Sequence, residues 1–256
     1  MDHRLYPMIF KRKSFHLFRN LETVPITDED ITEIQKAYQQ FIPLYPDIKT
    51  EICFVPAEES GCNRGEEYCI YLYSEKKENY LANIGYLGEQ LDLYLVSRNI
   101  ATLWFGIGKP QEITRNGLAF VIMIAAARIA DETKFRKDMY KSKRKPAEEV
   151  WQGAYMDGVT DIVRYAPSAC NTQPWLVRNE GDLYIYRYKK QGKRGIMPAD
   201  KVSLYNRIDL GIFLCFVDLC LEHQGISMRR ELFPDHGEDQ EYVLNAVYHC
   251  ERKQGV

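Results

Sequence analysis

Residues 166–175 read APSACNTQPW, and this loop is the most informative stretch of the chain. Its two prolines fix their own φ angles and restrict the residues before them, so the loop can take few shapes. Ser168, Asn171 and Gln173 add polar side chains to it. Such a loop can present fixed hydrogen-bond donors and acceptors to a flat heterocycle. A purely structural Asx or proline turn is the alternative.

Helices are predicted over residues 27–41 and 150–164, and two long apolar helices are predicted over residues 80–99 and 205–226. A helix that is apolar around most of its circumference is usually buried. The two segments align with a shift of 126 residues, which pairs Asp92 with Asp218. A strand containing the similar motifs IYLY and IYRY is predicted ahead of each helix. The repeated order favours a duplicated chain.

A highly charged stretch with few apolar residues, 131–149, separates the two copies and is typical of an exposed connection. We therefore expect two related halves, 1–149 and 150–256. A repeat of this length indicates duplicated halves rather than a solenoid. Two similar halves can pack as an internal pseudo-dimer, as two subunits of a homodimer do.

Composition limits the classes of function. With 34 basic and 36 acidic residues the net charge is −2, which provides no overall field for nucleic acid or a membrane surface. The N-terminus lacks the apolar run of a signal peptide, and the longest apolar stretch, 118–127, is too short to span a bilayer. Seven cysteines without a C-x-x-C pair argue against a disulfide framework or a zinc site. We expect a protein of the reducing cytoplasm.

Two short basic motifs could hold a phosphate. Residues 11–14 read KRKS and are followed by His16, and residues 142–146 read SKRKP. Arginine offers a planar fork of donors, lysine a point charge and serine a hydroxyl, which together suit a phosphate group. A solvated basic surface is the alternative for both motifs.

A third motif, LWFGIG at 103–108, combines two aromatic residues with two glycines. Glycine allows a ligand to approach the backbone closely, and a tight turn is the alternative explanation. The sequence contains no G-x-G-x-x-G, Walker A, H-E-x-x-H or G-x-S-x-G motif, and the histidines have no metal-ligand spacing.

In combination, these motifs resemble the FMN-dependent nitroreductase family. The resemblance rests on R-x-S near the start, A-P-S-x-x-N-x-Q-P-W, a long glycine-containing helix ending near W-F-G, and R-K-P. It implies an α+β nitroreductase-like fold, with mixed and antiparallel sheets packed against helices. The first half carries R-x-S, W-F-G and R-K-P, and the second half carries the A-P-S loop. This division resembles the fused, single-chain branch of the family, whose two related halves form one flavin site.

The resemblance also implies the roles of individual residues. Arg12 and Arg144 would hold the FMN phosphate, and Lys13, Ser14 and His16 would support the phosphate and the ribityl chain. Pro167, Ser168, Ala169 and Asn171 would line the isoalloxazine and the ribityl chain. Phe105 and Gly106 would approach the reactive ring edge.

The activity that the resemblance implies is transfer of reducing equivalents from NAD(P)H, through FMN, to a nitroaromatic, quinone or similar acceptor. The flavin would carry the chemistry, so no catalytic side chain and no metal are expected. The partners would be small molecules, with neither nucleic acid nor membrane, and the chain would be a monomer or weak homodimer. Two alternatives remain. One is a flavin-free binding protein that keeps the fold, and the other is a nucleic-acid binder using the seven Lys and Arg between 134 and 145.

Overall fold

The computed structural model describes residues 1–188, 197–236 and 241–252, and it divides into two compact units. The first unit comprises Asp2–Met139, and the second comprises Met1 and Tyr140–Val256. The division lies before the boundary expected after Glu149, so the segment 140–149 groups with the second unit. The hydrogen bonds that explain this grouping are described with the candidate site.

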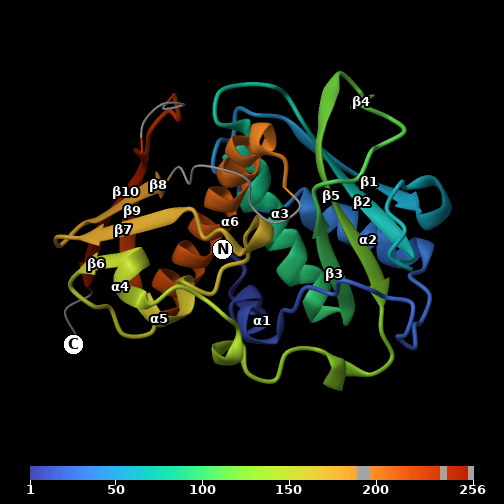
Figure 1. Cartoon of the computed structure of the whole chain (residues 1–256), viewed down its shortest axis with the longest axis horizontal. Coiled ribbons are helices and arrows are strands. Elements are labelled where there is room, and N and C mark those ends of the chain that lie inside the picture. The colour runs from blue at the N-terminus through green and yellow to red at the C-terminus, as the bar shows by residue number, and fades with distance from the viewer. Residues whose placement is uncertain (189–196, 237–240, 253–256) are drawn as a thin grey trace. The chain divides into compact units, whose positions relative to one another are not determined.

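The first unit contains an antiparallel sheet with the strand order β1-β2-β5-β3 (Figure 1). The short strand β4 pairs with the start of β5, also antiparallel. The strands are β1 Thr50–Pro56, β2 Tyr68–Ser74, β3 Ile100–Phe105, β4 Thr114–Arg115 and β5 Leu118–Arg128. The helices are α1 Tyr6–Lys11, α2 Asp28–Tyr38 and α3 Tyr80–Ser97, with short 3-10 turns at His3–Leu5, Ala57–Glu59 and Glu132–Lys134.

Local sequence explains the helices of this unit. Thr27 caps α2 by accepting from the backbone N–H of Asp30, whose carboxylate accepts from the backbone N–H of Thr27. This reciprocal capping box satisfies donors that the first helical turn leaves free. Helix α3 is buried along most of its length and packs against β2, β3 and β5, as its apolar circumference predicts.

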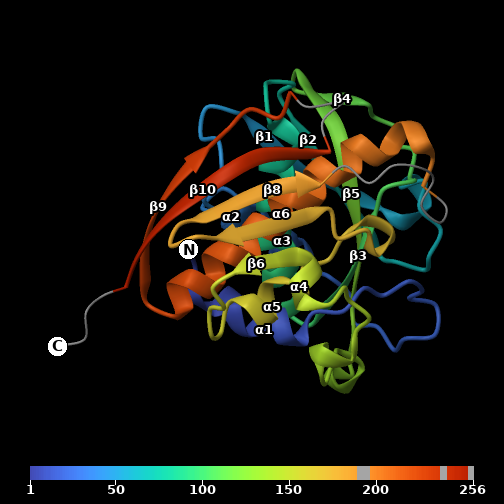
Figure 2. The same cartoon turned by 60° about the vertical axis from the view of Figure 1, so that its left-hand side comes forward.

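The second unit contains the sheet β6-β7-β8-β10-β9, in which only the pair β6–β7 is parallel (Figure 2). Its strands are β6 Trp151–Gly153, β7 Trp175–Asn179, β8 Leu183–Tyr188, β9 Ile226–Leu232 and β10 Tyr242–Arg252. Its helices are α4 Ala147–Val150, α5 Thr160–Val163 and α6 Val202–His223, with 3-10 turns at Ala169–Asn171 and Ala199–Lys201. A further 3-10 turn, Met139–Lys141, spans the point where the chain passes from the first unit to the second. Helix α6 packs against β8, β9 and α5.

Both units contain the same sequence of connections. In each, an antiparallel strand pair leads into the long buried helix, a strand follows the helix, and a final long strand pairs between its two neighbours. The order β1-β2-β5-β3 thus corresponds to β7-β8-β10-β9. These mixed sheets packed with helices confirm the predicted α+β fold class. The duplication itself stays a prediction.

Most predicted elements are present, and one is wrong. The helices expected at 27–41, 80–99 and 205–226 correspond to α2, α3 and α6. In place of the helix expected at 150–164, the end of α4 leads directly into β6, and a loop separates β6 from the short helix α5. Gly153 and Gly158 have φ angles of 88° and 69°, which a right-handed helix cannot contain. Among the described residues, no helix is both long and apolar enough to cross a membrane.

Candidate functional site

The loop 168–173 of the second unit has an unusual backbone. Cys170, Asn171 and Gln173 have φ angles of 50°, 53° and 48°, in the left-handed region that residues with a side chain rarely adopt. Asn171 and Cys170 are exposed, whereas Gln173 is buried. The loop therefore presents Cys170 and Asn171 to solvent, while Gln173 at its end is buried in the protein.

The loop is held from beneath by helix α6. The backbone N–H of Ala169 donates to Asp209 Oδ1 at 2.9 Å, and Thr172 Oγ1 donates to Asp209 Oδ2 at 3.4 Å. Ser168 Oγ accepts from the backbone N–H of Gln173 at 2.9 Å and closes the loop on itself. Burial raises the pKa of Asp209 to about 8, although both of its hydrogen bonds lower it.

The basic segment 143–145 packs along the same loop. Arg144 Nη1 donates to Asn171 Oδ1 at 3.0 Å, and Asn171 Nδ2 donates to the carbonyl of Lys143 at 3.2 Å. The backbone N–H of Lys145 donates to Gln173 Oε1 at 2.8 Å, and Lys145 Nζ donates to the carbonyl of Gln173 at 3.0 Å. The R-K-P and A-P-S motifs therefore meet within one unit.

The sequence assigns Arg144 to the first half, and the structure places it in the second unit. These hydrogen bonds, together with those from Arg144 Nη2 to the carbonyl of Tyr165 and from Arg164 Nη1 to the carbonyl of Lys145, bind the segment to the second unit. Of the other predicted loop residues, Pro167 is buried, and Ser168 and Ala169 are partly exposed.

In the first unit, Arg12 is held by two acidic residues of α3. Its Nε donates to Asp92 Oδ2 at 2.7 Å and lies 3.5 Å from Glu89 Oε1, and its side chain is only 3% exposed. Its Nη1 and Nη2 both lie 3.5 Å from Ser14 Oγ. The guanidinium is therefore committed to a buried ion pair and reaches Ser14 only by its outer nitrogens.

Asp92 is the centre of this buried network, and the sequence motifs predicted no site role for Asp92 or Glu89. Besides Arg12, Asp92 accepts from Thr102 Oγ1 at 2.5 Å and from Trp104 Nε1 at 3.0 Å, both on β3. Burial raises the pKa of Glu89 well above its usual range, which opposes the lowering by Arg12. A polar residue in an otherwise apolar buried helix is the signal that could have identified both.

The other predicted residues of the first unit lie near its surface. Lys13 is exposed, and its Nζ donates to the carbonyl of Lys134 at 3.1 Å. Ser14 is partly exposed and forms an isolated parallel bridge with Thr102, which aligns this segment with β3. His16 is exposed.

The W-F-G motif lies where β3 ends. Phe105 is partly buried beneath Arg64, whose guanidinium carbon lies 5.5 Å from the ring centroid. Gly106 is exposed in the turn that follows. A cavity of about 270 Å³ in this unit is lined by none of the predicted residues; its lining comprises Asn20, Leu21, Glu22, Ile129, Asp131 and Lys134.

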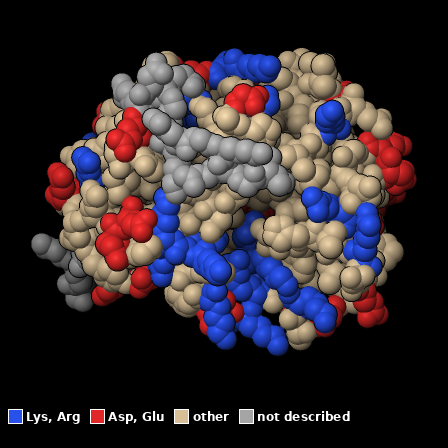
Figure 3. All heavy atoms as spheres, in the orientation of Figure 1, with Lys and Arg blue, Asp and Glu red and all other residues tan. Residues whose placement is uncertain are grey.

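The surface charge agrees with the balanced composition. Figure 3 shows Lys and Arg as well as Asp and Glu on the face drawn, so neither sign covers it. The face drawn therefore carries local positive charge without being basic throughout.

One family model matches most of the chain. The profile of the family described as "Putative TM nitroreductase" matches residues 4–220. A crystal structure of a "putative nitroreductase" from Thermotoga maritima MSB8 is similar, with 18% identity, a TM-score of 0.59, and coverage of 95% of this chain and 91% of that one. No curated protein matches the chain.

Two further crystal structures match over part of the chain. One is a "putative nitroreductase in complex with FMN" from Desulfovibrio desulfuricans, with 15% identity, a TM-score of 0.41, and coverage of 59% of this chain and 98% of that one. The other is a "Putative NADH Oxidase" from Clostridium acetobutylicum, with 16% identity, a TM-score of 0.41, and coverage of 58% of this chain and 99% of that one. Because the family profile covers most of the sequence, the chain belongs to the nitroreductase family, a family of oxidoreductases.

Proposed function

We propose that this protein is an FMN-dependent oxidoreductase that transfers reducing equivalents from NAD(P)H to a nitroaromatic, quinone or similar acceptor. The observation that carries the proposal is the strained loop 168–173, which corresponds to the A-P-S motif and is held rigidly by its neighbours. Family membership supplies the class of reaction.

The backbone of this loop is costly to maintain. A left-handed conformation costs a residue with a Cβ about 1–2 kcal/mol, and three residues of the loop adopt it. Such strain persists only where surrounding contacts enforce it, and it gathers at ligand-binding and catalytic sites. Asp209, Ser168 and Lys145 provide those contacts. A loop built only to connect two elements needs no such arrangement.

The second unit suits a flavin's polar groups and phosphate. The exposed amide of Asn171 lies beside the guanidinium of Arg144, which places a hydrogen-bonding group next to a positive charge. We assign Ser168, Ala169 and Asn171 to the isoalloxazine and ribityl, with Pro167 as the buried support of the loop. Arg144 supplies positive charge for the phosphate.

The candidate residues of the first unit fit the cofactor unequally. Ser14, Lys13 and His16 are accessible and suit a phosphate or ribityl chain. Arg12 does not suit direct phosphate contact, because leaving Asp92 would strand a buried carboxylate. We therefore assign Arg12 the positioning of Ser14. Phe105 and Gly106 are assigned to the reactive ring edge.

When bound, FMN supplies the two-electron redox chemistry, and the residues of this chain bind and orient it. This division of labour requires neither a nucleophile nor an acid–base pair among the candidate side chains. The exposed Asn171 amide would fix the ring's orientation, and Arg144 would offset the negative charge of the cofactor.

The test is to titrate cofactor-stripped protein with FMN and follow quenching of flavin fluorescence, then to add NADH or NADPH anaerobically and follow bleaching. We expect saturable binding and bleaching by at least one nucleotide. Loss of a hydrogen bond to the flavin in Asn171→Ala should weaken FMN binding about tenfold. Gln40→Ala, at an exposed position, is the matched control. Failure of the wild-type protein to bind FMN would reject the proposal.

The ion pairs that Arg12 forms with Asp92 and Glu89 favour a second candidate function, binding without a flavin. A flavin-free binding protein that keeps the fold has no use for a phosphate-binding arginine, and Arg12 is engaged by Asp92 and Glu89. This alternative predicts no FMN binding to the wild-type protein. Saturable binding that Ser14→Ala and Asn171→Ala each weaken would exclude it.

A further inference from the structure

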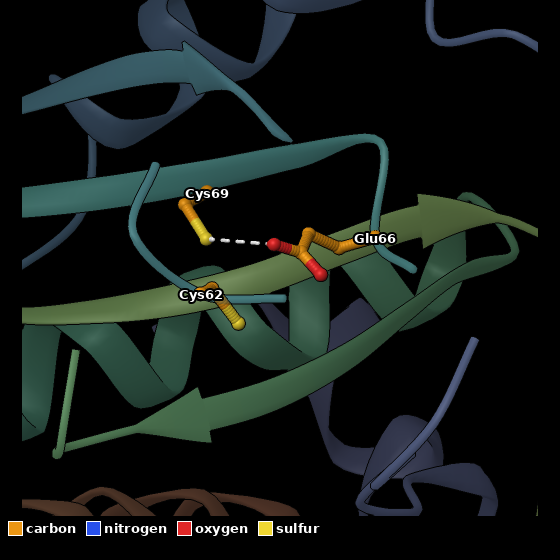
Figure 4. A group of neighbouring side chains, drawn as sticks. All are labelled: Cys62, Glu66 and Cys69. Carbon is orange, nitrogen blue, oxygen red and sulfur yellow. Dashed lines mark hydrogen bonds between the residues drawn. The ribbon is translucent and has the colours of Figure 1, made fainter. Parts of the chain in front are cut away.

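A second group of chemically reactive side chains lies in the first unit, between the 3-10 turn at Ala57–Glu59 and strand β2. Cys62, Glu66 and Cys69 are all buried, and one donor atom from each lies within 4.8 Å of the others. Figure 4 shows the Cys69 sulfur directed toward the Glu66 carboxylate, with Cys69 Sγ 3.9 Å from Glu66 Oε1, and the Cys62 side chain beside them. This convergence calls for an explanation beyond packing.

The loop that carries these residues is preorganised. Gly61, Asn63 and Gly65 have φ angles of 67°, 116° and 84°, so the chain turns sharply at alternate positions. The turns bring Cys62 back toward β2, where Cys69 begins the strand's buried run. A glycine at 61 is required because a Cβ there would lie 2.5 Å from the carbonyl oxygen of Lys109.

Hydrogen bonds from the loop fix the direction of the Glu66 carboxylate. Its Oε1 accepts from Ser60 Oγ at 3.1 Å and from the backbone N–H of Asn63 at 3.3 Å. Its Oε2 accepts from the backbone N–H of Arg64 at 2.7 Å. Hydrogen bonds of this kind orient carboxylates that bind metal ions and hold them in place before the ion arrives.

The three side chains bring two sulfur ligands and one carboxylate ligand into the same buried space. A soft or borderline cation suits this set, because thiolates bind such cations and metal binding displaces the thiol protons. Arg19, from an earlier segment of the chain, lies against this loop, and its Nη2 donates to Asn63 Oδ1 at 2.8 Å.

We propose that Cys62, Glu66 and Cys69 form a structural Zn²⁺ site that fixes the loop 60–66. Zinc takes thiolate and carboxylate ligands in tetrahedral geometry with bonds of about 2.0–2.3 Å, which sets ligand atoms a little less than 4 Å apart. The observed donor atoms need only small movements to reach that spacing. Water completes the fourth position. Hard cations such as Mg²⁺ and Ca²⁺ are disfavoured by two sulfur ligands.

The site would act on the neighbouring turn. The loop touches the segment 105–109 through Gly61 at Lys109 and through Arg64 over Phe105. Fixing the loop therefore restrains the turn that contains Gly106. Cysteine spacing alone does not predict this site, because the pattern is C-x-x-x-E-x-x-C and an acidic residue separates the two cysteines.

The experiment measures zinc in the purified full-length chain by elemental mass spectrometry, after passage over a chelating resin. We expect one zinc per chain in the wild-type protein, and loss of zinc in Cys62→Ser and in Cys69→Ser. Cys53→Ser, on β1 and outside the cluster, is the control that should retain zinc. Glu66→Gln should weaken zinc binding at least about tenfold, because changing even a group that only hydrogen-bonds to a metal ligand weakens metal binding by about that factor.

Because a cysteine variant can fail to fold, a second measurement uses the wild-type chain alone. Replacing zinc with Co²⁺ should produce thiolate-to-cobalt charge-transfer absorption and the visible bands of a tetrahedral ion. Three results would overturn the proposal: zinc-free protein that binds no added Zn²⁺, zinc that persists in the Cys62→Ser and Cys69→Ser variants, or a disulfide joining these two cysteines. FMN content, measured on the same samples, separates failure of the zinc site from failure of the flavin proposal.

Discussion

Asp209 lies beneath the strained loop with its carboxylate buried, and it joins the loop to helix α6. Its pKa of about 8 in the folded protein stands above the ordinary value of 3.8. The unfolded chain therefore releases this proton at lower pH than the folded protein does. The contribution of Asp209 to stability is fully present below pH 4 and is lost as pH rises toward 8.

We predict that the free energy of unfolding falls between pH 4 and pH 8 by up to about 1.4 kcal/mol per pH unit because of Asp209. Asp209→Asn cannot ionise, keeps an oxygen for the N–H of Ala169, and should flatten this dependence. Urea unfolding at a series of pH values measures it, with the exposed Asp200→Asn as control. A variant with the wild-type pH profile would show that Asp209 is ionised in the folded protein.

Residue types in a motif could be predicted from sequence, but their partners could not. Asn171 and Arg144 stand out by their motifs, and they do contact one another. The role of Asp209 is invisible because it lies 40 residues from Ala169 along the chain. Likewise, nothing in the KRKS motif reveals that Arg12 pairs with Asp92, which is 80 residues away. Only the folded chain supplies such pairings.

At the scale of elements, the correspondence between the units extends to a specific contact. Trp104, the fifth residue of β3, donates to Asp92 of α3. Arg230, the fifth residue of β9, donates to Asp218 of α6. Asp92 and Asp218 are the residues that the predicted repeat aligns. The same helix-to-strand contact therefore recurs with a different donor, which supports the proposed duplication.

The packing of α3 on its sheet depends on a glycine. A Cβ on Gly88 would lie 2.4 Å from the Trp104 side chain and 3.0 Å from that of Leu72. In an exposed helix, Gly→Ala stabilises by about 1 kcal/mol, because alanine loses less backbone entropy. Here we predict that Gly88→Ala lowers the free energy of unfolding by about 1–3 kcal/mol, the usual cost of overpacking a core.

Chemical denaturation measures this change, with Lys36→Ala on the exposed face of α2 as control. The control should shift the free energy of unfolding by less than about 0.5 kcal/mol. A Gly88→Ala protein as stable as the wild type would mean that α3 can move away from β3. It would also mean that the Asp92–Trp104 hydrogen bond tolerates that movement.

Elements were predictable where local signals agreed with tertiary contacts. Thr27 and the acidic first turn identify α2, and the long apolar pattern identifies α3. Strand β3 was missed because a short apolar segment has no distinguishing period. The residue pattern of 150–164 predicts a helix, but Gly153 and Gly158 adopt positive φ angles, which the pattern does not reveal.

For the whole molecule, the fold class was predictable and the division of the chain was less so. A charged stretch such as 131–149 is typical of an exposed linker, which placed the boundary at its end. The structure instead attaches residues after Met139 to the second unit, because Arg144 and Lys145 bind the loop at 171–173. Long charged side chains can tie a segment to a surface through hydrogen bonds, and composition does not record this.

The last prediction concerns stoichiometry and assembly. The chain has a single A-P-S loop and a single R-x-S segment, so one chain contains one set of candidate flavin ligands. We therefore predict one FMN per chain of 30.0 kDa, bound by a monomer over the micromolar range. Sedimentation equilibrium, followed separately at protein and flavin wavelengths, measures mass and occupancy together. A weak homodimer would raise the mass at high concentration and leave the occupancy at one FMN per chain. Flavin that sediments only with a species of twice the chain mass would show that a second copy completes the site. That result would contradict the interpretation of the chain as an internal pseudo-dimer, because duplicated halves remove the need for a partner subunit.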